Sequence, residues 1–104
     1  MKPDMPQEWV DMIRGILALH IPDRQVVLFG SRAGRSPKPH SDIDICVMGD
    51  DSLSAKTAAD LRDAFSASRL PVRVDVVEWA TTEASFRNII KAQAVEIFPA
   101  SLRA

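Results

Sequence analysis

The chain has 104 residues, 46% of them hydrophobic, which suits one small domain and is too apolar for a disordered protein. Its formal net charge is −1 and its pI is about 6.1, so it lacks the strongly basic character of a general nucleic-acid-binding protein. No apolar run could span a bilayer, and the N-terminus does not resemble a signal peptide. Cys46 is the only cysteine, which excludes an internal disulfide, and we expect a cytoplasmic protein with no membrane association.

The first predicted element is a helix from Gln7 to about His20, after a loose lead-in over residues 1–6. Its large side chains recur at the spacing of one helix face, in a stripe of Trp9, Ile13, Ile16, Leu17 and His20. We expect this stripe to cover one face of a sheet; the alternative is that Trp9 and Met12 face a partner. His20 is interpreted as a cap or surface group.

Two strands follow, with a basic loop between them. Arg24–Phe29 is predicted to be a buried strand, and Gly30–Arg35 a turn or short helix. Two prolines keep the next segment extended up to His40, which is interpreted as a solvated loop residue. The second strand is predicted over Asp42–Met48.

The second half of the chain continues with a helix and a third strand. Either Ser52 or Ser54 can cap the helix, which is predicted to end at about Ser68. The β-branched run Val72–Val77 is typical of a strand.

A third helix and a last apolar segment complete the chain. Thr81 or Thr82 is expected to cap this helix, with Glu83 in its first turn and an apolar stripe of Phe86, Ile89 and Ile90. The segment Val95–Phe98 reads equally well as a short strand or a last helical turn, and residues 99–104 are expected to be a loose end.

This order of elements predicts an α/β fold, a single domain over residues 1–104 with a small mixed sheet packed against helices. The short connection between the first two strands permits an antiparallel pair. The helical crossover from the second strand to the third favours a parallel pair.

A pair of acids at the start of the second strand indicates a metal site. Side chains alternate between the two faces of a strand, so Asp42 and Asp44 share one face. Adjacent carboxylates repel each other, and a hard cation such as Mg²⁺ relieves that repulsion. The alternative is a solvated strand end. Cys46 shares their face and is interpreted as a small buried hydrophobe.

The bend after the first strand has the composition of a phosphate site. Gly30 permits a sharp turn and close approach of a ligand, and Ser31 supplies a hydroxyl next to amides that can form an anion-binding nest. Basic side chains follow at Arg32, Arg35 and Lys38. A phosphate site next to a metal site fits a nucleoside triphosphate with bound magnesium.

A third acid lies inside the third predicted strand. Arg73 and Asp75 share one face of that strand, and valines occupy the other face. If the strand lies beside the second one, Asp75 completes a cluster with Asp42 and Asp44. If it is an exposed edge, Asp75 simply lies in water.

These motifs together resemble the minimal nucleotidyltransferase (MNT-type) proteins of the DNA polymerase beta-like nucleotidyltransferase superfamily. The resemblance is carried by Gly30-Ser31-Arg32-Ala33, by Ser41-Asp42-Ile43-Asp44-Ile45 and by Val74-Asp75-Val76-Val77. It covers nearly the whole chain. Members often read Gly-Ser-Arg-Ala-Arg-Gly, whereas Ala33 is followed here by Gly34-Arg35 in transposed order.

The resemblance implies a nucleotidyltransferase that moves a nucleoside monophosphate, most simply AMP from ATP, onto a hydroxyl acceptor. Two Mg²⁺ ions, about 3.5–4 Å apart in such sites, would be held by the catalytic acids Asp42, Asp44 and Asp75. The triphosphate would be held by Gly30, Ser31 and Arg32, with Arg32 neutralising charge. The resemblance also implies a HEPN-type protein partner, with this chain as the antitoxin of a toxin–antitoxin pair.

Two rival functions stay open from the sequence. One is a non-catalytic module that neutralises its partner through a helix face, with the acids as relics. The other is a sensor of nucleotide or metal that transfers nothing. The acceptor, the base preference and self-association into a homo-oligomer also stay open.

Overall fold

The computed structural model describes residues 3–99 and contains one four-stranded sheet with helices on both faces. In chain order the elements are α1 (Gln7–His20), β1 (Val26–Phe29), β2 (Ile43–Val47), α2 (Ala55–Ala67), β3 (Val74–Glu78), the 3-10 helix η1 (Trp79–Thr81), α3 (Ala84–Gln93) and β4 (Val95–Phe98). None of the helices in this described part of the chain is long and apolar enough to cross a membrane.

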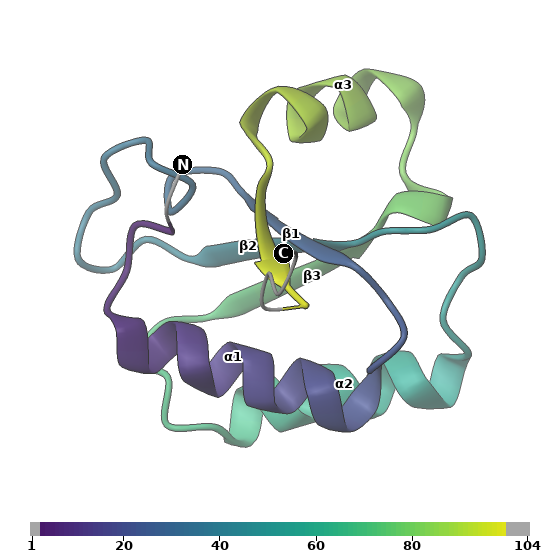
Figure 1. Ribbon diagram of the computed structural model, residues 1–104, viewed down its shortest axis with the longest axis horizontal. Helices are drawn as coiled ribbons and strands as arrows, with labels where there is room; N and C mark the ends of the chain where they lie inside the picture. Colours follow the sequence, from purple (N-terminus) through teal and green to yellow (C-terminus); the bar gives the residue numbers. More distant parts are fainter. Residues whose placement is uncertain (1–2, 100–104) are drawn as a thin grey trace, which may run out of the picture.

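The strands lie in the order β3-β2-β1-β4, with β1 and β2 at the centre (Figure 1). β1 is antiparallel to both of its neighbours, β2 and β4, whereas β2 and β3 are parallel. The parallel pair is joined by α2, since parallel strands need a long crossover. The predicted mixed α/β sheet is therefore confirmed, and the last apolar segment is a strand and not a helical turn.

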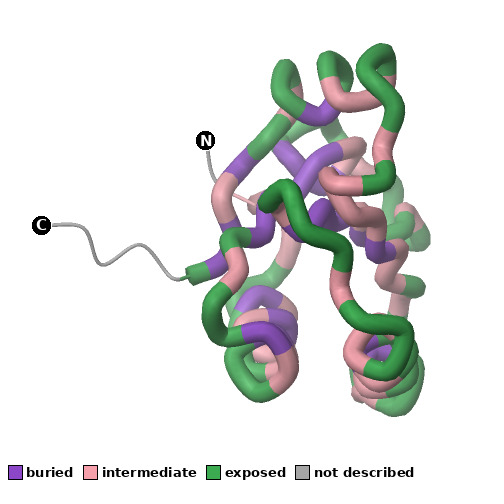
Figure 2. The backbone as a smooth tube through the Cα atoms, turned by 90° about the vertical axis from the view of Figure 1, so that its right-hand side faces the viewer, coloured by how far each residue is buried: buried purple, intermediate pink, exposed green. Residues whose placement is uncertain are grey.

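The two faces of the sheet are covered unequally. α1 and α2 pack side by side on one face, and α3 lies alone on the other (Figures 1 and 2). The larger part of the core lies under α1 and α2, with fully buried Ile13, Leu17, Leu28, Ile45 and Leu61. The smaller cluster beneath α3 consists of Val27, Phe29, Cys46 and Ile90. The α3 face thus has less apolar cover, and it carries the predicted acids.

Hydrogen bonds between residues near in sequence determine where α2 and α3 begin. Ser54 caps α2 by accepting the Thr57 N–H at 3.1 Å, which confirms one of the two predicted caps. The cap position of α3 is Glu83, so the prediction of a threonine cap was wrong. The hydroxyls of Thr81 and Thr82 donate to the Glu78 carbonyl at 3.3 and 2.6 Å and close the η1 turn instead.

Strand boundaries differ from the predicted ones by one or two residues. β2 begins after Asp42, and β3 begins after Arg73 and includes Glu78. Glu78 uses its carboxylate to accept the Leu53 N–H at 2.6 Å, on the far side of the sheet from the candidate site. Strand alternation places Glu78 on the opposite face from Asp75, so it takes no part in the candidate site.

The N-terminal lead-in is attached to the domain within the described residues. The Asp4 N–H donates to the Arg32 carbonyl at 2.6 Å, and Met5 packs against the core. These contacts differ from the loose lead-in predicted for residues 1–6. Residues 1–2 and 100–104, also predicted to be loose, lie outside the described residues.

Candidate active site

The Gly30 bend directly abuts the acid on the neighbouring strand. Gly30 follows β1 with φ of +77°, in the left-handed region that favours glycine. A Cβ built there would lie 2.5 Å from Oδ2 of Asp44, closer than atoms can approach. The Gly30 N–H donates to Oε1 of Gln93 at the end of α3, at 2.9 Å. Only a residue without a side chain can therefore occupy this bend while Asp44 keeps its place.

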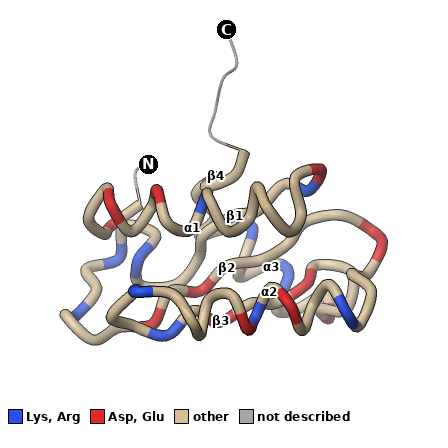
Figure 3. The backbone as a smooth tube through the Cα atoms, turned by 90° about the horizontal axis from the view of Figure 1, so that it is seen from below, with Lys and Arg blue, Asp and Glu red and all other residues tan. Residues whose placement is uncertain are grey.

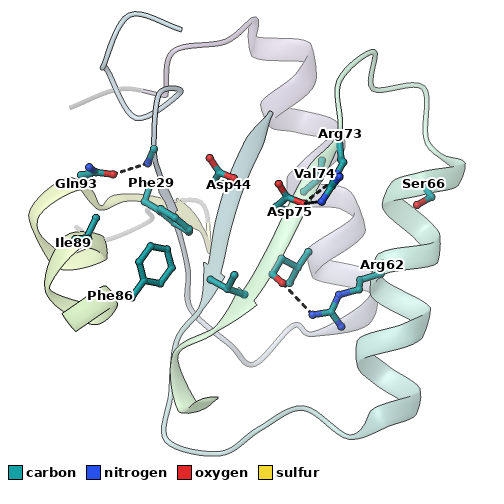
Figure 4. Close-up of a pocket in the computed structure, with 13 residues that line it drawn as sticks. Phe29, Asp44, Arg62, Ser66, Arg73, Val74, Asp75, Phe86, Ile89 and Gln93 are labelled. Carbon is teal, nitrogen blue, oxygen red and sulfur yellow. Dashed lines mark hydrogen bonds and ion pairs between the residues drawn. The ribbon is translucent and has the colours of Figure 1, made fainter. Parts of the chain in front are cut away.

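Asp44 and Asp75 lie at the same register position of two parallel neighbouring strands. Asp44 pairs with Asp75 across β2 and β3, and with Phe29 across β2 and β1. Since paired residues share a face, both carboxylates project into one cavity on the α3 side of the sheet (Figure 4). The predicted convergence of the third acid with the second strand is thus seen in the structure.

Asp42 lies at the rim of this arrangement. It precedes β2, is exposed and does not line the cavity that contains Asp44 and Asp75. Its charge nevertheless acts on the cavity, because it helps to raise the pKa of Asp44. The structure therefore brings two of the three predicted acids together and places the third beside them.

The electrostatics of Asp44 reflect burial and crowded negative charge. The pKa of Asp44 is raised from an ordinary value of 3.8 to about 6. Burial is the largest cause, followed by the negative charges of Asp75 and then Asp42, whereas Arg73 opposes the shift. An ionised Asp44 is thus unfavourable in this setting, and a bound cation would relieve it.

Arg73 occupies the position beside Asp75 where a cation would be expected. Its Nε and Nη2 lie 2.8 and 2.6 Å from Oδ1 of Asp75. Within residues 3–99, no three side chains of the metal-binding types are gathered closely enough to hold an ion. The carboxylates of Asp44 and Asp75, with Asp42 at the rim, are ligands of the kind that Mg²⁺ prefers. Arg73 binds Oδ1 of Asp75 and so competes with a metal ion for that carboxylate.

Arg32 is buried in the loop before β2 and does not line the cavity. Its side chain is 5% exposed, and its guanidinium lies 5.1 Å from the centre of the Trp9 ring. It donates hydrogen bonds of 3.1–3.4 Å to the backbone carbonyls of Asp4, Lys38, Pro39 and Ser41. These contacts differ from the predicted role at phosphate, since the guanidinium holds the loop before β2 and the N-terminal lead-in. Trp9 contacts Arg32 in this way instead of facing outward to a partner.

The cavity has a volume of about 750 Å³ and two unlike walls. One wall is apolar and comes from the end of β1 and from α3, with Phe29, Phe86 and Ile89. The other comes from α2 and β3, with Arg62, Ser66 and Arg73 (Figure 4). Gly30 and the two paired acids lie between these walls. The cavity can thus hold a ligand with an apolar end and a charged middle.

Sequence reasoning missed the apolar wall and Gln93. Phe86, Ile89 and Ile90 were predicted to form one apolar stripe, and of the three only Ile90 is fully buried. Ile89 is 48% exposed, which is unusual for a large apolar side chain, and it lines the cavity. No motif marks Gln93, whose contact with Gly30 spans 63 positions.

Cys46 belongs to the core and not to the site. It is fully buried between the sheet and α3, in the cluster with Val27 and Phe29. Burial is the main reason that the pKa of its thiol is raised to about 11. A neutral, enclosed thiol is a poor nucleophile, which agrees with the interpretation as a small hydrophobe.

Comparison with known proteins gives consistent matches over most of the chain. The family model described as Polymerase beta, Nucleotidyltransferase matches residues 13–101. A curated relative, "Probable protein adenylyltransferase MntA" of Haemophilus influenzae, is 38% identical over 94 residues, which is 90% of this chain and 82% of that protein.

Two solved structures have a similar fold. A crystal structure of a toxin–antitoxin with AMP-PNP matches with a TM-score of 0.71 and 27% identity, over 86% of this chain and 72% of that one. A complex of tri-AMPylated Shewanella oneidensis HEPN toxin with MNT antitoxin matches with a TM-score of 0.68 and 26% identity, over 90% and 72%.

Proposed function

Because this chain belongs to the Polymerase beta nucleotidyltransferase family, in its minimal MNT-type branch, we propose that it transfers AMP from ATP onto a hydroxyl of a protein. The observation that carries the proposal is the pairing of Asp44 with Asp75 directly beside the Gly30 bend. This arrangement combines two functions in one cavity. Carboxylates of this kind bind cations, and the bend offers a place for phosphate.

The nucleotide fits the cavity with its triphosphate at the bend. The backbone amides that follow Gly30, including that of Ser31, can donate hydrogen bonds to phosphate oxygens beside the bend. The nucleoside then lies against Phe86 and Ile89, which supply an apolar surface on the same side as Gly30. Gln93 supports the bend through its contact with the Gly30 N–H.

Asp42, Asp44 and Asp75 would hold Mg²⁺ in this site. When bound, the metal supplies positive charge that polarises the phosphates and lowers the pKa of an acceptor hydroxyl. Burial first, and then the negative charges of Asp75 and Asp42, raise the pKa of Asp44, and a bound cation would offset both effects. Arg73 would leave Asp75 when the site is filled, because both cations compete for one carboxylate.

In the reaction the acceptor oxygen forms a bond to the α-phosphorus of ATP, and the bond from that phosphorus to the bridging oxygen breaks. Pyrophosphate leaves with the bonding electrons. Asp75 is placed to take the proton of the acceptor hydroxyl, because it lies on the outermost strand of the sheet, open to a second protein. Catalysis rests mainly on positioning and on electrostatic stabilisation.

The acceptor is proposed to be a HEPN-type toxin, with this chain as its antitoxin in a reducing cytoplasm. One similar solved structure is a tri-AMPylated HEPN toxin in complex with an MNT antitoxin, and the other is a toxin–antitoxin with AMP-PNP. Arg32 is assigned a positioning role: it holds the loop that leads into Asp42 and Asp44, rather than neutralising phosphate.

Intact mass spectrometry tests this function. The chain is incubated with ATP, Mg²⁺ and a co-expressed HEPN-type protein, and an AMP-sized mass increase on the partner is expected. Asp44→Asn and Asp75→Asn should lower the rate by about a hundredfold or more. Asp63→Asn, an exposed acid on α2, is the matched control and should leave the rate unchanged. If both site variants neutralise the partner as well as the unaltered chain, the non-catalytic binding module is the correct function.

A further inference from the structure

Strand β3 forms one edge of the sheet, and its free side is open along the cavity. β2 covers only its other side. The Ile43 N–H donates to the Arg73 carbonyl at 2.9 Å, which fixes the direction in which backbone groups alternate. In a parallel ladder with this register, the N–H and C=O groups of Val74 and Val76 point away from β2. The Val76 carbonyl already accepts a hydrogen bond from Arg62, so the edge presents the N–H and C=O of Val74 and the N–H of Val76 to an incoming chain.

A groove follows this edge out of the active-site cavity. A second cavity of about 300 Å³ adjoins the first and shares Ser66, Arg73 and Val74 with it. It extends to Leu70 and Val72 at the start of the strand. We call the combined space the edge groove, which has residues 72–76 as one wall and residues 62–66 of α2 as the other. Because its lining runs along residues 72–76, it has the direction of an extended segment.

The charges that border the edge groove favour an acidic occupant. Arg62 reaches from α2 across the groove, and its Nη2 donates to the Val76 carbonyl at 3.1 Å (Figure 4). The Arg73 side chain is 75% exposed and bound only to Asp75. Acidic and basic positions alternate along α2 (Figure 3), and among them it is the basic Arg62 that lines the groove. A carboxylate on the occupant can pair with Arg73 and so release Asp75.

We propose that the edge groove binds an extended, acidic segment of the acceptor protein, which adds to β3 as a fifth strand and presents its hydroxyl to Asp75. This inference rests on the proposed transferase function and specifies how the acceptor docks. In an added strand, the residue opposite Asp75 shares its face, with the two Cβ atoms about 4.5–5.5 Å apart. Strand addition therefore places one side chain of the segment directly beside the catalytic carboxylate.

Amide hydrogen exchange on the complex tests the docking directly. The probe is the HEPN-type protein co-expressed with this chain, mixed with ¹⁵N-labelled chain and followed by NMR. The Val74 and Val76 amides should exchange about tenfold more slowly, or slower still, in the complex. Unchanged exchange at both amides in a complex that forms would overturn the inference, even if AMP transfer is observed. Slowed exchange without any transfer would support the docking and reject the transferase.

A pair of substitutions tests the role of the free edge in transfer. Val74→Pro removes one outward N–H at the first position of β3, where an edge strand tolerates proline. Val74→Ala shortens the same side chain and keeps the N–H. We expect the proline variant to transfer AMP about tenfold more slowly than the alanine variant, as the loss of a strand hydrogen bond implies. ATP binding should be equal in the two variants, and equal transfer rates would contradict the proposal.

Discussion

Gly30 and Asp44 exclude any side chain between them. A Cβ at position 30 would lie 2.5 Å from Oδ2 of Asp44, and the φ of +77° disfavours other residues as well. The bend and the acid are therefore one structural unit, formed by the end of β1 and the middle of β2. A substitution at Gly30 should therefore change the position of Asp44, and a substitution at Asp44 should change the Gly30 bend.

Gly30→Ala should displace Asp44 and destabilise the fold by about 1–3 kcal/mol through the strained backbone. ATP binding and AMP transfer should both weaken. Gly15→Ala is the control, since a Cβ there meets nothing within 4 Å. In the middle of α1 it should stabilise by about 0.5–1 kcal/mol. Urea unfolding measures the change in stability, and isothermal titration measures the change in ATP affinity. Unaltered ATP binding in Gly30→Ala would contradict the claim that the bend and Asp44 form one structural unit.

Asp44→Asn should stabilise the metal-free protein at neutral pH. The folded-state pKa of Asp44, about 6, lies above its ordinary value of 3.8, so the folded state binds more protons between these values. Stability from this group is therefore present at low pH and is lost as pH rises through 6. After allowance for partial solvent exposure, the loss is about 1–2 kcal/mol.

Urea unfolding at pH 4 and pH 7.5 tests this prediction. The difference between Asp44→Asn and the unaltered chain should be small at pH 4 and should grow in favour of the variant at pH 7.5. Because the variant and the unaltered chain are compared at each pH, the contributions of all other titrating groups cancel. If the difference in unfolding free energy is the same at both pH values, ionisation of Asp44 does not destabilise the folded state.

Arg73→Gln should bind divalent cations more tightly than the unaltered chain. The substitution removes the charge that pairs with Asp75 at 2.6 Å, and an exposed pair of this kind is worth up to about 1 kcal/mol. The expected gain in Mn²⁺ affinity is thus about two- to fivefold, measured by paramagnetic relaxation or calorimetry. Arg69→Gln, an exposed arginine outside the cavity lining, should change little. Weaker Mn²⁺ binding in Arg73→Gln would argue against competition for Asp75.

Arg32→Lys should cost stability, because one ammonium cannot reach the set of carbonyls that the guanidinium spans. We expect a loss of about 1–3 kcal/mol, because the hydrogen bonds of a buried guanidinium are lost. Arg35→Lys, at an exposed position in the same loop, is the matched control. Urea unfolding measures the role of Arg32 in holding the loop, and ATP binding measures its predicted role at phosphate. If Arg32→Lys leaves stability unchanged but weakens ATP binding, Arg32 contacts phosphate as its motif predicts.

The sequence was sufficient for those parts of the site that depend on strand alternation. A period of two places Asp44 and Asp75 on predictable faces, and the helical crossover makes their strands parallel. Asp42 follows the same alternation but lies just outside β2, so its distance from the cavity could not be predicted.

Side-chain direction in loops and helices was harder to predict. The pattern Gly30-Ser31-Arg32 gives no information on where the arginine points, and in the structure it points to the backbone carbonyls of the loop before β2. The helical stripe that contains Ile89 looks the same whether it faces a core or a cavity. The start of α3 was misplaced because the threonine hydroxyls bind the Glu78 carbonyl within their own turn.

The contact between Gln93 and the Gly30 N–H has a consequence for synthesis on the ribosome. Domains begin to fold from the N-terminal side as they emerge. The acids and the bend are translated early, but the group that holds the bend is made 63 residues after it. β4, which pairs with β1, emerges later still. A nascent chain therefore carries every carboxylate of the site before it can shape the place where ATP would sit.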